Sequence, residues 1–203
     1  NAINGNAWLP SNVATFTAGT SGTTAAVTLP AATTSYTFGV KGLDATETLT
    51  TTSAAPVTGT TTTDGESTAD KSNAQGGALI VATITENTTS SNVTTGHVKV
   101  AGASKEVQVN ITQAAAPLGI TAPELSGSIF TFAAPAATDV TDLSAVTSLV
   151  VKKDGVTLTG GGTDYTVSGL TITLTTVPQM GEVYTFTIQN GDAAAETVSF
   201  TVS

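Results

Sequence analysis

Cysteine is absent from the sequence of 203 residues. A disulfide framework and thiolate-bound metal sites are therefore excluded, while the redox compartment stays open because many extracellular β-sandwiches also lack cysteine. The length predicts two domains of about 100 residues each. A domain of that size buries enough surface to hold an ordinary hydrophobic core without a covalent cross-link.

Arginine is absent as well. The six basic residues are all lysine and stand against 15 acidic residues, which gives a formal net charge of -9. Phosphate binding draws on clustered lysine and arginine and on bidentate arginine contacts, so we expect no nucleic acid partner. An anionic membrane surface is disfavoured for the same reason. Charged residues make up only 10% of the chain, so hydroxyl and amide side chains must cover the surface, as suits an extracellular or virion particle.

Long apolar runs are missing too. No segment of about 20 apolar residues occurs, so we expect no membrane insertion. A basic start followed by an apolar run, the pattern of a signal peptide, is not seen either. Helical periodicity is almost absent, and apolar and polar residues alternate along most of the chain.

This alternation predicts short strands separated by turns. In "GHVKVAGASKEVQVNITQAAAP" two valine-rich arms flank the turn "AGAS", which is typical of a hairpin in a β-sandwich. Two further hairpins follow in the second half, with turns at Asp154-Gly155 and Ser168-Gly169. A third, "VYTFTIQNGDAAAETVSFTV", sets Tyr184, Phe186 and Ile188 opposite Val198, Phe200 and Val202.

Between the two halves the run "QAAAPLGITAP" interrupts the alternation. Its flanking prolines indicate a semi-rigid linker with the boundary near Pro117. The sequence therefore predicts an N-terminal arm at 1–12, a first sandwich at 13–116, a linker at 117–123 and a second sandwich at 124–203. One segment, "AATDVTDLSAVTSL", could form a short helix in place of strand and turn, although Thr and Val are poor helix formers.

The first half resembles the BACON domain, an immunoglobulin-like sandwich common in Bacteroidetes proteins and in phages that infect them. The stretch "FTAGTSGTTAAVTLPAATTSYTF" looks like the first two strands of that family, and "TTGHVKVAGASKEVQVNITQAAAP" looks like its last hairpin. The middle, "TSAAPVTGTTTTDGESTADKSNAQGG", lacks the tryptophan-containing segment of the family. The resemblance implies a glycan-binding role.

The second half resembles a module of phage tail fibres and other virion proteins. The resemblance covers "KDGVTLTGGGTDYTVSGLTITLTTVPQMGEVYTFTI", in which a hairpin with a glycine turn precedes "DYTVSG", an alternating strand, a proline and a Gly-acid pair. Together the two resemblances imply an all-β fold with two tandem immunoglobulin-like β-sandwich domains.

The resemblances imply a non-enzymatic virion structural or surface protein of a phage that infects Bacteroidetes: a capsid decoration, head fibre or tail component. Its expected partners are other virion proteins, further copies of itself and host-surface carbohydrate. The alternative is a secreted or cell-surface module of the bacterium that binds glycan or mucin. Such bacterial proteins often carry an Asp-Ser/Thr O-glycosylation motif, and no Asp here precedes Ser or Thr, which favours the virion.

Candidate catalytic residues are few. His97 is the only histidine, and a catalytic triad also needs a positioned nucleophile and an orienting group, so a surface or edge-strand histidine is the better interpretation. Zinc needs three or four N or S ligands, which this chain cannot supply. Asp139 and Asp142 are the carboxylates best placed for calcium, but no EF-hand spacing surrounds them. The sequence thus predicts no catalytic residue, no metal and no cofactor.

The only tryptophan lies in "NAINGNAWLP", ahead of the first predicted strand. Trp8 and Leu9 are the predicted interaction anchor, either to a neighbouring subunit or to a glycan. The alternative is that Trp8 caps the core of its own domain, because an amphipathic ring serves buried edges and interfaces alike.

Overall fold

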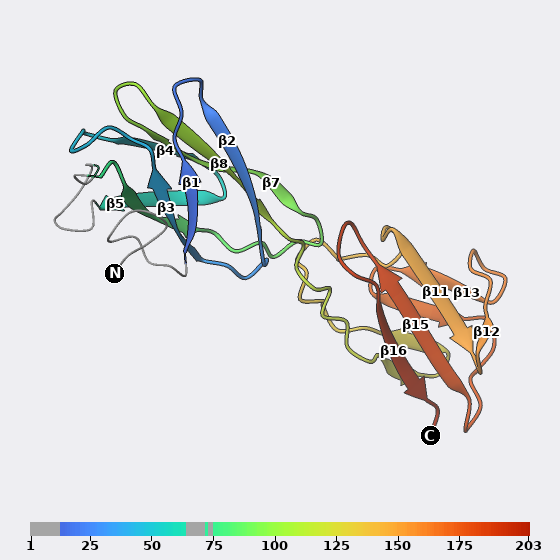
Figure 1. Cartoon of the computed structure of the whole chain (residues 1–203). Coiled ribbons are helices and arrows are strands. Elements are labelled where there is room, and N and C mark those ends of the chain that lie inside the picture. Colours follow the sequence, from blue (N-terminus) through green and yellow to red (C-terminus); the bar gives the residue numbers. More distant parts are fainter. Residues whose placement is uncertain (1–12, 64–71, 73–74) are drawn as a thin grey trace. The chain divides into compact units, whose positions relative to one another are not determined.

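The computed structural model describes residues 13–63, 72 and 75–203 (Figure 1). The described residues form strands, turns and irregular segments, and none of them is helical. No helix long and apolar enough to cross a membrane occurs among them. The chain divides into two compact units, one made of Asn1–Asn87 with Val93–Ala114, the other of Thr88–Asn92 with Ala115–Ser203.

The first unit is a sandwich of two four-stranded sheets, with strand orders β1-β3-β6-β5 and β2-β8-β7-β4. Strands β2 and β8 run parallel side by side (Figure 1), as do β1 and β3, and the other pairs are antiparallel. The strands are β1 (Ala14–Thr17), β2 (Thr23–Leu29), β3 (Ser35–Lys41), β4 (Thr50–Ala54), β5 (Val57–Thr63), β6 (Ala78–Ile84), β7 (Val93–Ala101) and β8 (Glu106–Gln113).

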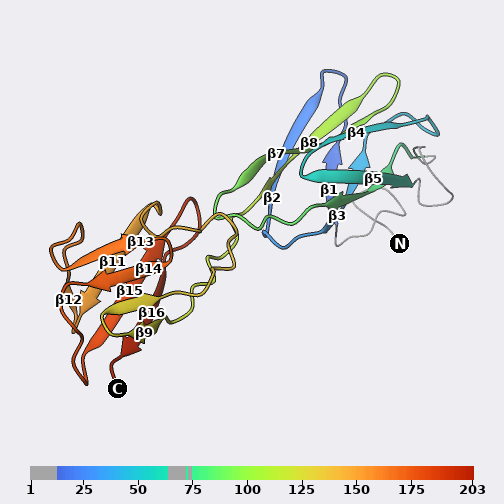
Figure 2. The same ribbon diagram turned by 180° about the vertical axis from the view of Figure 1, so that it is seen from behind.

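The second unit is also built from two four-stranded sheets, ordered β13-β14-β10-β9 and β12-β11-β15-β16, with every pair antiparallel (Figure 2). The strands are β9 (Glu124–Ser126), β10 (Ile129–Thr131), β11 (Ser148–Lys153), β12 (Val156–Thr157), β13 (Tyr165–Ser168), β14 (Thr171–Leu174), β15 (Val183–Gln189) and β16 (Glu196–Thr201).

Both units follow the immunoglobulin arrangement of strands. In that fold the first sheet has the order A-B-E-D and the second the order C-F-G. Counting along each unit, β1-β3-β6-β5 and β9-β10-β14-β13 take the places of A-B-E-D, while β4-β7-β8 and β11-β15-β16 take those of C-F-G. The fold class predicted from the sequence, all-β with two tandem immunoglobulin-like β-sandwich domains, is confirmed.

Alternation places one face of each strand in a core, as expected for a sheet with one solvated face. In β7 and β8 the pairs Val98–Val109 and Val100–Val107 lie directly opposite each other and are fully buried. The core of the second unit contains the Phe130 ring, whose centroid lies 5.1 Å from Tyr184, 4.9 Å from Phe186 and 5.4 Å from Phe200.

The hairpins of the second unit follow the sequence prediction closely. Asp154 and Gly155 both have positive φ, at 48° and 83°, as the turn between β11 and β12 requires. The next turn is shifted by one residue, to Gly169 and Leu170, because Ser168 still pairs with Thr171. The segment at 136–149, which the sequence left open to a short helix, forms turns and bends up to residue 147 and then enters β11.

In the third hairpin the two apolar sets named from the sequence face each other at two positions, with Tyr184 opposite Phe200 and Phe186 opposite Val198. Ile188, however, lies opposite Glu196.

A short stretch of the β6–β7 connection belongs to the second unit. We call residues 88–92 the crossover segment. Its central residue, Ser90, is fully buried. Ser90 donates its N–H to Asp139 Oδ1 at 2.9 Å and its hydroxyl to Asp139 Oδ2 at 2.6 Å, and its hydroxyl oxygen accepts from Asn190 Nδ2 at 2.8 Å. Its carbonyl accepts from the N–H groups of Asp192 and Ala193 at 2.8 and 3.0 Å. The crossover segment is thus part of the second sandwich.

The segment at 117–123, which the sequence predicted as a linker, lies within the second unit. Leu118 is fully buried in its core. The N–H groups of Gly119 and Ile120 donate to the two carboxylate oxygens of Glu196 at 3.0 and 2.8 Å. The chain therefore passes from the first unit to the second between Ala114 and Ala115. It also enters the second unit at Thr88 and leaves it again after Asn92.

The contact between Asp139 and the crossover segment makes stability depend on pH. Desolvation alone would raise the pKa of Asp139, but the side-chain and backbone hydrogen bonds from Ser90 outweigh it and hold the pKa below its ordinary value. A carboxyl whose folded pKa is lowered contributes stability above its unfolded pKa of about 4 and loses that contribution as pH falls through the folded pKa.

We expect Asp139→Asn to lower the free energy of unfolding of the second unit by about 1–2 kcal/mol at pH 7, a value kept small because the carboxylate is largely exposed. The difference from the wild type should shrink as pH falls below about 4, where both chains carry a neutral side chain. Urea unfolding of the wild type and of Asp139→Asn at pH 7, 4 and 2.5 measures this difference in the free energy of unfolding. A difference that does not change with pH would contradict the assignment.

Candidate functional site

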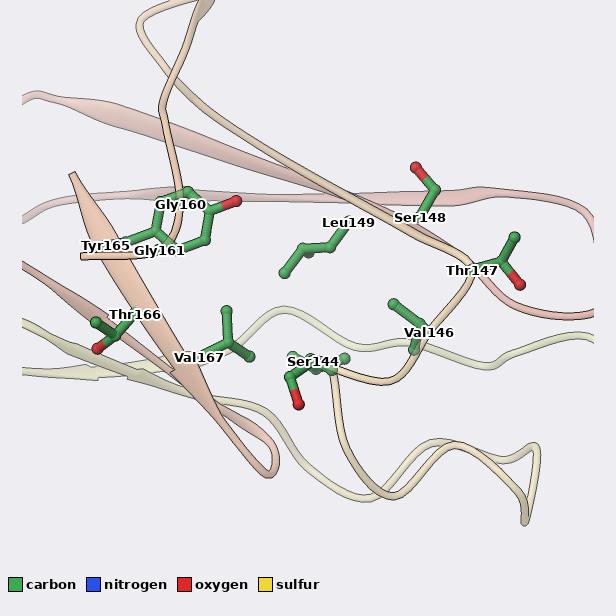
Figure 3. Close-up of a pocket in the computed structure, with 11 residues that line it drawn as sticks. Ser144, Val146, Thr147, Ser148, Leu149, Gly160, Gly161, Tyr165, Thr166 and Val167 are labelled. Carbon is green, nitrogen blue, oxygen red and sulfur yellow. The ribbon is translucent and has the colours of Figure 1, made fainter. Parts of the chain in front are cut away.

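A groove of about 470 Å³ lies in the second unit, beside the start of β11 (Figure 3). Its volume is in the range of sites that hold small ligands or single side chains. Figure 3 shows Leu149 in the middle, with Tyr165 and Val167 on one side and Val146 on the other. The residues that line it are Leu143, Ser144, Val146, Thr147, Ser148, Leu149, Gly160, Gly161, Tyr165, Thr166 and Val167.

None of the lining residues is charged. The single titratable group is the Tyr165 phenol, and burial raises its pKa above the ordinary value, so it stays neutral over the physiological range. The remaining polar groups are hydroxyls and backbone amides. Such a groove can hold apolar side chains and hydrogen-bond a backbone.

One border of the groove is an uncovered part of β11. Strand β12 pairs with β11 only at Lys152 and Lys153, and the last contact on that side runs from Leu158 N–H to the Val151 carbonyl at 2.8 Å. Alternate residues of an antiparallel strand direct their backbone groups to the same side. Leu149 therefore points its N–H and C=O to the side that β12 leaves uncovered.

The opposite border is the edge strand β13, which pairs only with β14. Ser168 pairs with Thr171 across the two-residue turn, and in such a hairpin the residues that flank the turn hydrogen-bond each other. Val167 therefore points its backbone groups away from β14. Gly162 N–H donates to the Tyr165 carbonyl on that outer side at 2.9 Å. The groove thus lies between two sheet edges on one side of the sandwich.

His97 lies on β7, an inner strand of its sheet, opposite Ala54 of β4 and Asn110 of β8. It is half-buried. The sequence placed this histidine on the surface or on an edge strand, and the position on an inner strand corrects the second of these options. The strand prediction was sound, but the order of strands in a sheet cannot be taken from alternation alone.

The carboxylates considered for calcium bind neighbouring protein groups instead. Asp139 accepts two hydrogen bonds from Ser90, and Asp142 accepts from Ser144 N–H at 2.8 Å. That backbone hydrogen bond is the largest influence on Asp142 and lowers its pKa. Within the part of the chain that the structure describes, no three His, Asp or Glu side chains gather closely enough to hold a metal ion.

A second polar cluster involves Tyr184 at the start of β15. Its hydroxyl donates to Glu182 Oε2 at 2.9 Å, and Lys153 Nζ lies 2.5 Å from Glu182 Oε1. The hydrogen bond from Lys153 leads the effects that lower the pKa of Glu182, while burial, followed by the Glu182 carboxylate, raises the pKa of Tyr184. These three groups satisfy one another, so the cluster is structural.

The predicted anchor residues Trp8 and Leu9 lie outside the described residues. The groove between β11 and β13 was missed by the sequence reasoning. Its only sequence signal is the brevity of the second arm of "SLVVKKDGVTL", which precedes a run of glycines. Strand β12 ends at Thr157, ahead of that run, so the first half of β11 pairs with β15 on one side and with no strand of the described residues on the other.

No protein-family model matches the chain, and no curated protein matches it. Solved structures with a similar fold include the CupB2 chaperone of Pseudomonas aeruginosa, at 11% identity over 87% of this chain and 97% of that one, with a TM-score of 0.33. The I9–I11 tandem of titin is 13% identical over 90% of this chain and 63% of that one, with a TM-score of 0.27. The tandem Ig repeats of Dlar are 9% identical over 85% and 99%, with a TM-score of 0.28. At these values the likeness does not extend to function.

Proposed function

We propose that this chain is a non-enzymatic structural and interaction protein on the surface of a virion, as a capsid decoration, head fibre or tail component of a phage that infects Bacteroidetes. The resemblance of the two halves to a BACON domain and to a phage fibre module supports this role. The low content of charged residues and the many hydroxyl side chains support it too, because with 10% charged residues the like-charge repulsion between copies is weak, although the net charge of -9 still opposes close packing.

The observation that favours this role over a glycan-binding module is the burial of the aromatic side chains. Tyr165 and Tyr184 are buried, and Tyr36 is partly buried and stacks on Phe38 with ring centroids 5.6 Å apart. Among the residues that the structure describes, every aromatic side chain is buried or partly buried. A sugar ring stacks on an exposed aromatic face, whereas the least buried rings of the described surface, those of Phe16, Tyr36 and Phe200, are partly covered by the core against which they pack.

We expect the chain to be a stoichiometric component of purified phage particles. Electron microscopy with an antibody against the chain should label particles at symmetric positions, and labelling should disappear when the antibody is first absorbed with purified protein. Antigen confined to the bacterial surface or the culture medium would contradict the proposal and favour the bacterial adhesion module. A glycan array tests that alternative directly.

A further inference from the structure

At the groove of the second unit, the start of β11 and the outer side of β13 have no strand beside them among the described residues. Leu149 and Val167 pack against the core cluster but are only partly buried, because no strand of the described residues covers the side of the sandwich on which they lie. Their backbone N–H and C=O groups point into the same open side. Apolar side chains and unpaired backbone groups together are the features that accept an added strand.

The charge of the chain restricts what can enter. A second copy carries a net charge of -9, so acidic segments would meet like-charge repulsion on approach. The groove itself is uncharged. A segment that suits it is therefore neutral, partly apolar and short, and carries alternate side chains that can enter a slot between two sheet edges.

The N-terminal arm, residues 1–12, has this composition. It contains no Asp, Glu or Lys. In an extended chain Ile3, Gly5, Ala7 and Leu9 would share one side, while Asn4, Asn6 and Trp8 would lie on the other. One side could therefore cover the half-exposed core, while the Trp8 ring would contribute a large contact area at the rim.

We propose that the groove between β11 and β13 binds the N-terminal arm of a second copy as an added β-strand. This inference rests on the proposed function, in which many copies gather on one particle. The donor and acceptor surfaces are different parts of the chain, so the contact is heterologous. Repeating it gives a ring if the rotation closes and an open row if it does not.

A peptide of residues 1–12 provides a direct probe. Trp8 is the only tryptophan, so a chain that begins at residue 13 has no tryptophan emission of its own, and the peptide reports binding through its fluorescence. We expect a saturable blue shift and a rise in anisotropy when this chain is added. In heteronuclear spectra of the labelled chain, the amides of Leu149 and Val167 should be among those that shift.

Matched variants separate the groove from the rest of the surface. Val167→Asp places a carboxylate in the groove and should weaken binding of the peptide at least tenfold. Val156→Asp makes the same change at a side chain of β12 that is 68% exposed and does not line the groove, and it should bind like the wild type. The amide shifts of the unaltered chain test the site without any variant, should Val167→Asp fail to fold.

Three results would overturn the inference. The first is that the tryptophan emission and anisotropy of the peptide do not change when the chain is added. The second is amide shifts confined to the first unit, which would indicate that the arm caps its own domain. The third is a full chain that remains monomeric by light scattering at every concentration. Labelling of particles tests the proposed function separately, since it does not depend on how copies contact one another.

Discussion

A fragment of residues 115–203 is expected to be severely destabilised, whereas a fragment of residues 1–114 is expected to fold. Fragment 115–203 lacks the crossover segment, which belongs to the second unit together with residues 115–203. Without it, the Asp139 carboxylate, the Asn190 amide and the N–H groups of Asp192 and Ala193 lose their partner Ser90. At roughly 1 kcal/mol for each of these hydrogen bonds, the loss is on the order of 5 kcal/mol, comparable with the whole stability of a small domain.

A rescue fragment tests whether the crossover segment is the cause. Ala115 N–H donates to Asn92 Oδ1 at 2.8 Å, so a short Gly-Ser linker can join residue 92 to residue 115 and replace 93–114. We expect the fragment 88–92, linker, 115–203 to give well-dispersed heteronuclear spectra and cooperative urea unfolding. The same fragment with Ser90→Ala is the control and should lose part of the gain. Equal stability of fragment 115–203 with and without the crossover segment would contradict the prediction.

The two fragments are expected to differ in stability because the crossover segment connects two strands of the first unit but packs in the second. The first unit gives up five residues of a connection between β6 and β7, and these residues add nothing to its own sheets. Their release only lengthens a loop, and a longer loop costs little because closure entropy grows slowly with length. The second unit loses the hydrogen bonds by which Ser90 holds Asp139 and residues 190–193 together, which costs more.

Local pattern was enough to predict the strands and the hairpins that join them. In β7 and β8 the alternating valines and the turn "AGAS" identify both strands and their register, since a shift by one residue would expose the apolar face. The turn at Asp154-Gly155 could be predicted because few residue pairs adopt positive φ twice. Both predictions depend on neighbours a few residues apart.

The crossover segment and the groove could not be predicted because they depend on distant partners. The sequence "TTSSN" at 88–92 has the composition of a polar loop, and nothing in it indicates that Ser90 binds Asp139, 49 residues further along. The groove results from a two-residue strand, β12, whose shortness leaves β11 partly uncovered. Alternation predicts that strands exist, but it does not say which edges remain unpaired.

The Phe130→Ala change is expected to lower the free energy of unfolding of the second unit by about 3–5 kcal/mol. Phe130 is fully buried at the centre of β10. Its ring lies edge-on to Phe186 and Phe200 and is tilted toward Tyr184, so the substitution leaves a cavity and removes three aromatic contacts at once. Each such contact contributes about 0.5–1.5 kcal/mol beyond the buried area.

Urea unfolding followed by residue-resolved amide intensities measures both units in one sample. The matched control is Ile129→Ala on the same strand, where the side chain is 41% exposed and truncation should cost less than about 1 kcal/mol. Because the first unit has its own core around Phe38, its transition should stay unchanged while that of the second moves to lower urea. If both transitions moved together, the two sandwiches would share one cooperative core, and the division at the crossover segment would be wrong.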